Sequence, residues 1–256
     1  MIGDKTFKIV VAADLEELSR RAAEFVAQYV ISLAKKKDRV SIALCGGETP
    51  RGLYQHLARD NFQITIPWRQ IHLFWGDERW VSLQHKESNY RLAYEALISR
   101  VPIPPENVHP MVGETTDPQK AADAYEKKLR GFFGSSRERW PRFDLAILGI
   151  GTDGHTASLF PGLPVLKEKK RWVTALYIEK VRSYRLTLTL SVFNHAAQVI
   201  FLAAGREKAP IIKEGLATDH PQAHFPYRLI KLHHGQTLFF LDAAAASFME
   251  QSKETK

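Results

Sequence analysis

Cysteine is nearly missing from this chain of 256 residues, since Cys45 is the only one. A single thiol excludes an intramolecular disulfide framework and is typical of a reducing compartment. The sequence also has no C-x-x-C, no H-E-x-x-H and no G-x-S-x-G. These absences argue against the common zinc sites and against a serine nucleophile. We therefore expect no metal, and we expect Cys45 to pack as a small apolar residue.

Long hydrophobic runs are also missing. The N-terminal apolar run ends before Asp14 and is too short for a signal peptide or a membrane-spanning helix. No other stretch is apolar enough to span a bilayer. We expect a cytoplasmic protein that does not enter a membrane.

The charge is unbalanced, with a formal net charge of +8 and a pI near 9.5. A basic protein attracts nucleic acid, a membrane surface or a small anionic substrate. The basic clusters at 35–37 and 167–171 lack interleaved aromatic residues, and no nucleic-acid module is recognisable. We expect a monomer that binds no nucleic acid, and the charge favours an anionic small molecule.

Short apolar runs alternate with longer amphipathic ones, which is typical of an α/β fold. The 45% hydrophobic content is sufficient for one large core, and we expect a single domain over residues 1–256. Helices are predicted from Asp14 to about Lys37 and at about 50–60, 88–100, 117–134, 206–217 and 243–251. Strands are predicted at 7–11, 40–45, 71–75, 143–148, 172–178, 185–192, 199–204 and 237–241.

Little helix separates the predicted strands at 172–178 and 185–192, which indicates antiparallel or mixed pairing there. The fold class is therefore α/β: an open, mostly parallel, Rossmann-like sheet with helices on both faces, partly mixed in its C-terminal part. In such sheets ligands bind beyond the carboxyl ends of the strands.

The second strand runs into Gly46-Gly47-Glu48-Thr49-Pro50. Gly46 and Gly47 allow the main chain to approach a ligand, and Thr49 with Pro50 is a good helix start. Free backbone N–H groups at a helix start bind anions. The pattern fits a phosphate site, although an ordinary tight turn would show the same residues.

The third strand runs into Asp77-Glu78-Arg79, three charges that require solvent, partners or a ligand. The fourth runs into residues 149–162, which contain G-x-G-x-x-G. Pro161, Gly162 and Pro164 stop any long helix there, so we reject a dinucleotide site. The loop instead presents Asp153 and His155, a histidine able to take a proton near neutral pH.

Three further cations lie near strand ends. Arg185 opens a predicted strand, and Arg206 and Lys208 follow the next one. A guanidinium and an ammonium are both suited to phosphate.

Taken together, these loops resemble those of the 6-phosphogluconolactonases, within the larger group that includes the glucosamine-6-phosphate deaminases. The stretches that carry the resemblance span most of the chain in the family's order. They are LCGGETP (44–50), GDER (76–79), SNYR (88–91), GIGTDGHTASLFPG (149–162), RLTLTL (185–190) and AGREKA (204–209). Cys45 stands where the family often has serine.

The resemblance implies the deaminase/lactonase fold and hydrolysis of 6-phospho-D-glucono-1,5-lactone in the oxidative pentose phosphate pathway, without a cofactor. It further implies that His155 acts as general base, oriented by Asp153, while Asp77 and Arg79 position sugar hydroxyls or stabilise the oxyanion. The implied phosphate site consists of Gly46, Gly47, Thr49, Arg185, Lys208 and, as a helper, Arg206.

The sequence argues against two alternative functions. The deaminases resembled here carry a glutamate five residues after the histidine, where this chain has Phe160, and an apolar ring cannot shuttle protons. A non-catalytic sugar-phosphate sensor of the same fold requires a helix-turn-helix ahead of it. We expect none, because the first predicted strand begins at about Phe7.

Overall fold

The structure is a computed structural model that describes residues 7–112, 117–134, 140–217 and 225–249. Within them, seven strands form one parallel sheet in the spatial order β1-β10-β9-β6-β2-β3-β5. The strands are β1 (Phe7–Ala12), β2 (Val40–Leu44), β3 (Ile71–Trp75), β5 (Val108–His109), β6 (Leu145–Gly149), β9 (Gln198–Ala203) and β10 (Gln236–Asp242). This architecture confirms the predicted fold class.

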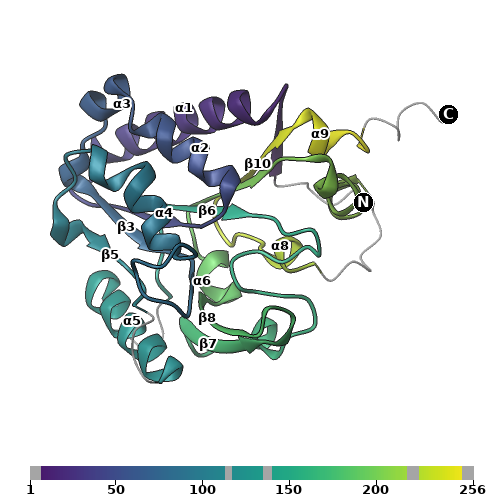
Figure 1. Ribbon diagram of the computed structural model, residues 1–256. Helices are drawn as coiled ribbons and strands as arrows, with labels where there is room; N and C mark the ends of the chain where they lie inside the picture. The colour runs from purple at the N-terminus through teal and green to yellow at the C-terminus, as the bar shows by residue number, and fades with distance from the viewer. Residues whose placement is uncertain (1–6, 113–116, 135–139, 218–224, 250–256) are drawn as a thin grey trace.

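Helices cover both faces of this sheet (Figure 1). The α-helices are α1 (Leu15–Ala34), α2 (Glu48–Leu57), α3 (Asp60–Thr65), α4 (Asn89–Ala96), α5 (Pro118–Phe133), α6 (Leu190–Asn194), α7 (Ala209–Ile212), α8 (Pro226–Leu229) and α9 (Ala243–Ala246). None of the described helices is long and apolar enough to cross a membrane.

Adjacent residues of β3 show how the two faces are filled. Leu73 borders a small apolar space together with Val26 of α1 and Leu57 of α2. Phe74 points to the opposite face, where its ring lies 5.0 Å from that of Phe132 at the end of α5. Because successive side chains of a strand point to opposite faces, a buried strand must be apolar at every position.

The start of α1 follows from its capping residues. Asp14 accepts a hydrogen bond from the backbone N–H of Glu17 at 2.9 Å, and Glu17 in return accepts from the backbone N–H of Ala13 at 2.7 Å. This arrangement satisfies one N–H group that the helix leaves free and the N–H group of the residue before the cap. The predicted cap at Asp14 is confirmed.

The antiparallel pairing predicted for the C-terminal part lies in a second sheet. β4 (Asp77–Arg79), β8 (Ser183–Leu188) and β7 (Val173–Ile178) form this three-stranded sheet in the order β4-β8-β7. In Figure 1, β7 and β8 lie with α5 below the main sheet, whereas α1 and α2 lie above it.

Several predicted boundaries were wrong, three of them in the C-terminal half of the chain. The strand expected at 185–192 ends at Leu188, and α6 follows it. The helix expected at 206–217 is a 3₁₀ turn, the short α7 and a π-helical turn, because the Tyr227 hydroxyl donates to the Ile211 carbonyl and occupies an acceptor of the regular helix. The last helix ends at Ala246, and positions 250–251 of its predicted range lie outside the described residues.

Two histidines meet at the β3–β5 edge. His72 Nδ1 lies 3.2 Å from His109 Nε2, and the His109 ring stacks on Phe74 at 4.3 Å. Burial lowers the pKa of His109 to about 4, with further contributions from His72 and Lys128. Burial, and then Arg39, lowers the pKa of His72 as well.

This pair predicts a loss of stability in acid. A histidine held neutral in the fold takes up its proton only when the chain unfolds, so stability falls as the pH drops from about 6.5 to about 4. We expect His109 to account for about 1–2 kcal/mol of this loss, discounted for its partial exposure. Urea unfolding across this range should show that His109→Phe is less acid-sensitive than wild type, whereas the exposed-site control His85→Phe is not. Equal acid sensitivity of His109→Phe and wild type would contradict this assignment.

Candidate active site

A cavity of about 350 Å³ lies at the carboxyl ends of the central parallel strands. β2 and β6 are neighbours in the sheet. β3 lies on the far side of β2 and β9 on the far side of β6, so the chain continues from these two strands in opposite directions. The cavity therefore lies where the strand order reverses. Its volume is in the range of small-molecule sites. The residues that line it are Cys45, Gly46, Gly47, Glu48, Thr49, Pro50, Asp77, Arg79, Asn89, Gly149, Ile150, Gly151, His155, Ala157, Leu202, Ala203, Ala204, Glu207 and Lys208.

The loop after β2 forms one wall and turns directly into α2. Gly47 is the N-cap of α2 with φ +106°, a conformation that favours glycine. The helix thus begins at Glu48, and the prediction that Thr49 caps it was wrong. The backbone N–H groups of Glu48 and Thr49 lie in the first turn, where a helix binds anions.

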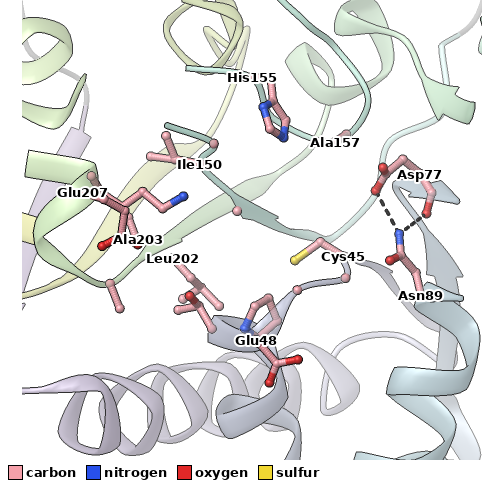
Figure 2. Close-up of a pocket in the computed structure, with 18 of the residues that line it drawn as sticks. Cys45, Glu48, Asp77, Asn89, Ile150, His155, Ala157, Leu202, Ala203 and Glu207 are labelled. Atoms are coloured by element: carbon pink, nitrogen blue, oxygen red, sulfur yellow. Dashed lines mark hydrogen bonds between the residues drawn. The ribbon is translucent and has the colours of Figure 1, made fainter. Parts of the chain in front are cut away.

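His155 enters the cavity from the opposite rim (Figure 2). Its Nδ1 lies 2.5 Å from Asp153 Oδ1. A carboxylate only accepts hydrogen bonds, so Nδ1 carries the proton and the lone pair lies on Nε2. The imidazole also stacks on Phe160 at 4.2 Å with an angle of 19° between the rings. The ring is therefore held on two sides and keeps one basic nitrogen.

Asp153 is held in its ionised form. Burial alone would raise the pKa of this carboxyl, but hydrogen bonds from Lys180 and His155 outweigh burial and hold the pKa well below its usual range. Lys180 Nζ lies 2.6 Å from Asp153 Oδ2, so both carboxylate oxygens have a partner. An ionised Asp153 stabilises the imidazolium that forms when His155 accepts a proton.

Glycine is required where this loop passes the histidine. A Cβ on Gly151 would lie 2.1 Å from His155 Nδ1 and 2.9 Å from Asp153 Oδ1. Gly154 has φ +78°, and the ring of Phe225 packs against it. The glycine-rich pattern thus serves close packing around the histidine.

Asp77 is buried, and two neutral donors hold its carboxylate, of which Figure 2 shows Asn89. Ser158 Oγ donates to its Oδ2 at 2.7 Å, and Asn89 Nδ2 donates to its backbone oxygen at 2.9 Å and to Oδ1 at 3.3 Å. A Cβ on Gly46 would lie 1.7 Å from Asn89 Oδ1, so Gly46 makes room for this amide. Neither Asn89 nor Ser158 was predicted as a site residue.

Glu78 is a structural carboxylate. It accepts from the backbone N–H groups of Arg79, Asn89 and Tyr90 and from the Ser88 hydroxyl. Burial raises its pKa, although these backbone hydrogen bonds act in the opposite direction. Glu78 thereby fixes the start of α4, which carries Asn89.

Two arginines lie opposite each other in the small sheet. Arg79 of β4 is paired in register with Arg185 of β8, and Arg79 lines the cavity whereas Arg185 does not. Burial, and then the charge of Arg79, lowers the pKa of Arg185. Like charges directly opposite in a ladder repel each other, so an anion near them relieves this repulsion.

The loop after β9 provides Lys208, which lines the cavity. Arg206 does not line it; its guanidinium is exposed and lies 6.0 Å from the centre of the Phe248 ring. Of the ten predicted site residues, the structure brings seven to the cavity wall and places Asp153 directly behind His155. Arg185 and Arg206 lie outside the lining.

Cys45 is buried, and burial raises the pKa of its thiol, so it stays protonated near neutral pH. Its predicted packing role therefore fits the structure. Among the described residues, no three His, Cys, Asp or Glu side chains are grouped so that they could hold a metal ion.

Comparison with known proteins identifies the family. The model described as glucosamine-6-phosphate isomerases/6-phosphogluconolactonase matches residues 13–239. A protein named 6-phosphogluconolactonase from Synechocystis sp. is 39% identical over 238 residues, which cover 93% of this chain and 96% of the relative. Its namesake from Nostoc sp. is 37% identical over 239 residues, covering 93% and 97%.

A solved structure agrees with these sequence matches. The 6-phosphogluconolactonase from Trypanosoma brucei is 30% identical and has a TM-score of 0.84, covering 94% of this chain and 98% of that one. The matched region includes every loop that lines the cavity. This chain therefore belongs to the glucosamine-6-phosphate isomerase/6-phosphogluconolactonase family.

Proposed function

We propose that this protein hydrolyses 6-phospho-D-glucono-1,5-lactone to 6-phospho-D-gluconate, with His155 as the general base. The observation that carries the proposal is the hydrogen bond of His155 Nδ1 to an ionised Asp153 at the cavity wall, with no partner for Nε2 among the described residues. The relatives named 6-phosphogluconolactonase support the choice of substrate. This reaction is a step of the oxidative pentose phosphate pathway.

The chemistry requires one proton to move twice. His155 Nε2 takes a proton from water while the water oxygen bonds to C1 of the lactone, and the carbonyl electrons move to the oxygen. Arg79 stabilises the resulting oxyanion, and Asp77 accepts hydrogen bonds from sugar hydroxyls. The intermediate then collapses, the bond from C1 to the ring oxygen breaks, and His155 returns the proton to that oxygen.

Phosphate binding is assigned to the other wall. The loop from Gly46 through Gly47 to Thr49 lines the cavity together with Lys208, and we assign the phosphate to the backbone N–H groups of this loop. A helix start and an ammonium both favour a phosphate dianion. Arg185 adds positive potential behind Arg79, and Arg206 contributes only at longer range.

Lys208→Met is expected to raise KM for the lactone by about 10- to 100-fold, because a hydrogen bond to a charged group is lost. The exposed Lys167→Met has the same change of charge and should leave KM unchanged. Steady-state rates measured with both variants test this assignment. A KM for Lys208→Met within a factor of two of wild type would contradict it.

The substrate is tested by comparing 6-phosphogluconolactone with unphosphorylated glucono-1,5-lactone, together with ammonia release from glucosamine 6-phosphate. We expect kcat/KM to fall by about 10²-fold or more without the phosphate, since remote binding energy positions the reacting carbon. No ammonia release is expected, because Phe160 occupies the face of His155 where a proton-shuttling carboxylate would be required. Ammonia release without lactone hydrolysis would refute the proposal.

We further propose that the enzyme is a cytoplasmic monomer that does not bind nucleic acid or membranes. Its formal charge of +8 is explained as attraction of an anionic substrate. Sedimentation tests the monomeric state, and heparin binding at physiological salt tests the absence of nucleic-acid binding. Tight heparin binding would contradict the latter.

A further inference from the structure

The turn between β7 and β8 brings a lysine to the catalytic loop. This turn is a 3₁₀ segment from Glu179 to Val181, followed by Arg182 in the left-handed conformation with φ +48°. From it, Lys180 reaches across 27 residues of sequence to Asp153, with Nζ 2.6 Å from Oδ2. The proposed catalytic mechanism gives Lys180 no role.

Asp153 bridges the side chains of His155 and Lys180. Asp153 accepts from His155 through Oδ1 and from Lys180 through Oδ2, so a single carboxylate is shared between two cations whenever His155 is protonated. The Lys180 side chain is 64% exposed, whereas those of His155 and Asp153 are 31% and 27% exposed. The lysine can therefore be removed without opening a cavity.

Asp153 and Lys180 act in opposite directions on the protonation of His155. The negative charge of Asp153 favours the imidazolium, and the ammonium of Lys180 opposes it by neutralising part of that charge. A histidine next to a neutralised carboxylate gives up its proton at lower pH. It is then available as a base over a wider pH range.

We propose that Lys180 is a positioning residue that sets the basicity of His155 through Asp153. The inference rests on the proposed role of His155 as base. Lys180 binds Oδ2 of Asp153 and neutralises part of its charge, so it moves the acidic limb of the pH–rate profile to lower pH.

The other charged side chains around the cavity take no part in the contact between Lys180 and Asp153. Apart from Asp153 on its own loop and Lys180 on the hairpin turn, the charged side chains around the cavity belong to the loops after β2, β3 and β9. They are Glu48, Asp77, Arg79, Glu207 and Lys208. A change at Lys180 leaves all of them in place, so a shifted titration reports on the lysine.

The test is an NMR titration of the His155 ring in the free enzyme, compared among variants. Lys180→Met and Lys180→Gln should both raise the titration midpoint of this ring by about 0.2 to 0.7 pH units, the change that corresponds to one exposed ion pair. Lys180→Arg keeps the charge and should restore the wild-type midpoint. Lys170→Met, at the opposite end of β7, is the control for the loss of one positive charge and should not move it.

The acidic limb of kcat/KM for lactone hydrolysis should move by the same amount and in the same direction. A midpoint that is unchanged or lowered in Lys180→Met and Lys180→Gln would overturn the proposal. Because the NMR titration needs no turnover, it separates two failures. A raised midpoint in a protein without lactonase activity would refute the proposed function and leave the coupling intact.

Discussion

Replacing His155 by alanine is expected to lower kcat/KM for 6-phosphogluconolactone by about 10²- to 10⁴-fold, the contribution typical of a positioned general base. The variant removes the ring nitrogen that takes the proton from water, and it leaves the phosphate-binding loop unchanged. KM should therefore change much less than kcat. Initial rates corrected for spontaneous hydrolysis measure both constants.

The control for this variant is His234→Ala, because His234 is exposed and lies outside the cavity lining. It should keep the wild-type rate. A thermal melt checks that His155→Ala is folded, since its side chain is only partly buried and forms no part of the core. A kcat for His155→Ala close to wild type would remove His155 from the mechanism.

Gly151→Ala should inactivate the enzyme nearly as strongly, although it removes no reacting group. The new methyl would lie 2.1 Å from His155 Nδ1, so the imidazole must shift and lose its hydrogen bond to Asp153. A displacement of about 1 Å at a catalytic group costs roughly 10²-fold in rate. We expect kcat to fall by about that factor, and the ring titration of His155 should change in the same variant.

Gly131→Ala serves as the matched control, because a Cβ at Gly131 meets no atom within 4 Å and Gly131 lies in α5 away from the cavity. Its rate should equal that of wild type. If Gly151→Ala turned over substrate at the wild-type rate, the geometry described for the histidine would be incorrect.

The main sheet could be predicted from the sequence because its strands are buried on both faces. Val40–Leu44 and Ile71–Trp75 are nearly continuous apolar runs, and both were located to within a residue. β4 was not predicted as a strand, since Asp77, Glu78 and Arg79 have no apolar pattern. The buried carboxylates of β4 are compensated by donors from α4 and the loop of Ser158, which only the folded chain brings together.

The residues of the candidate site were likewise predictable only in part. The loops after β2, β6 and β9 were predictable, because ligands bind where parallel strands end and these loops contain glycine and charged residues. Ser158, Asn89 and Lys180 were not predicted, since each acts through a partner 12 to 81 residues away in the sequence. The Ser88-Asn89 pair at a predicted helix start was the available signal for Asn89. Arg206 follows the rule for the carboxyl ends of strands, whereas Arg185 lies within β8. Both lie outside the cavity lining.

The central claim is that this cavity accelerates opening of the phosphorylated lactone. The most direct test generates 6-phosphogluconolactone in situ and follows its disappearance by NMR with the wild-type protein, beside a blank without protein. We expect disappearance far faster than in the blank, with 6-phosphogluconate as the sole product. Disappearance at the rate of the blank would contradict it.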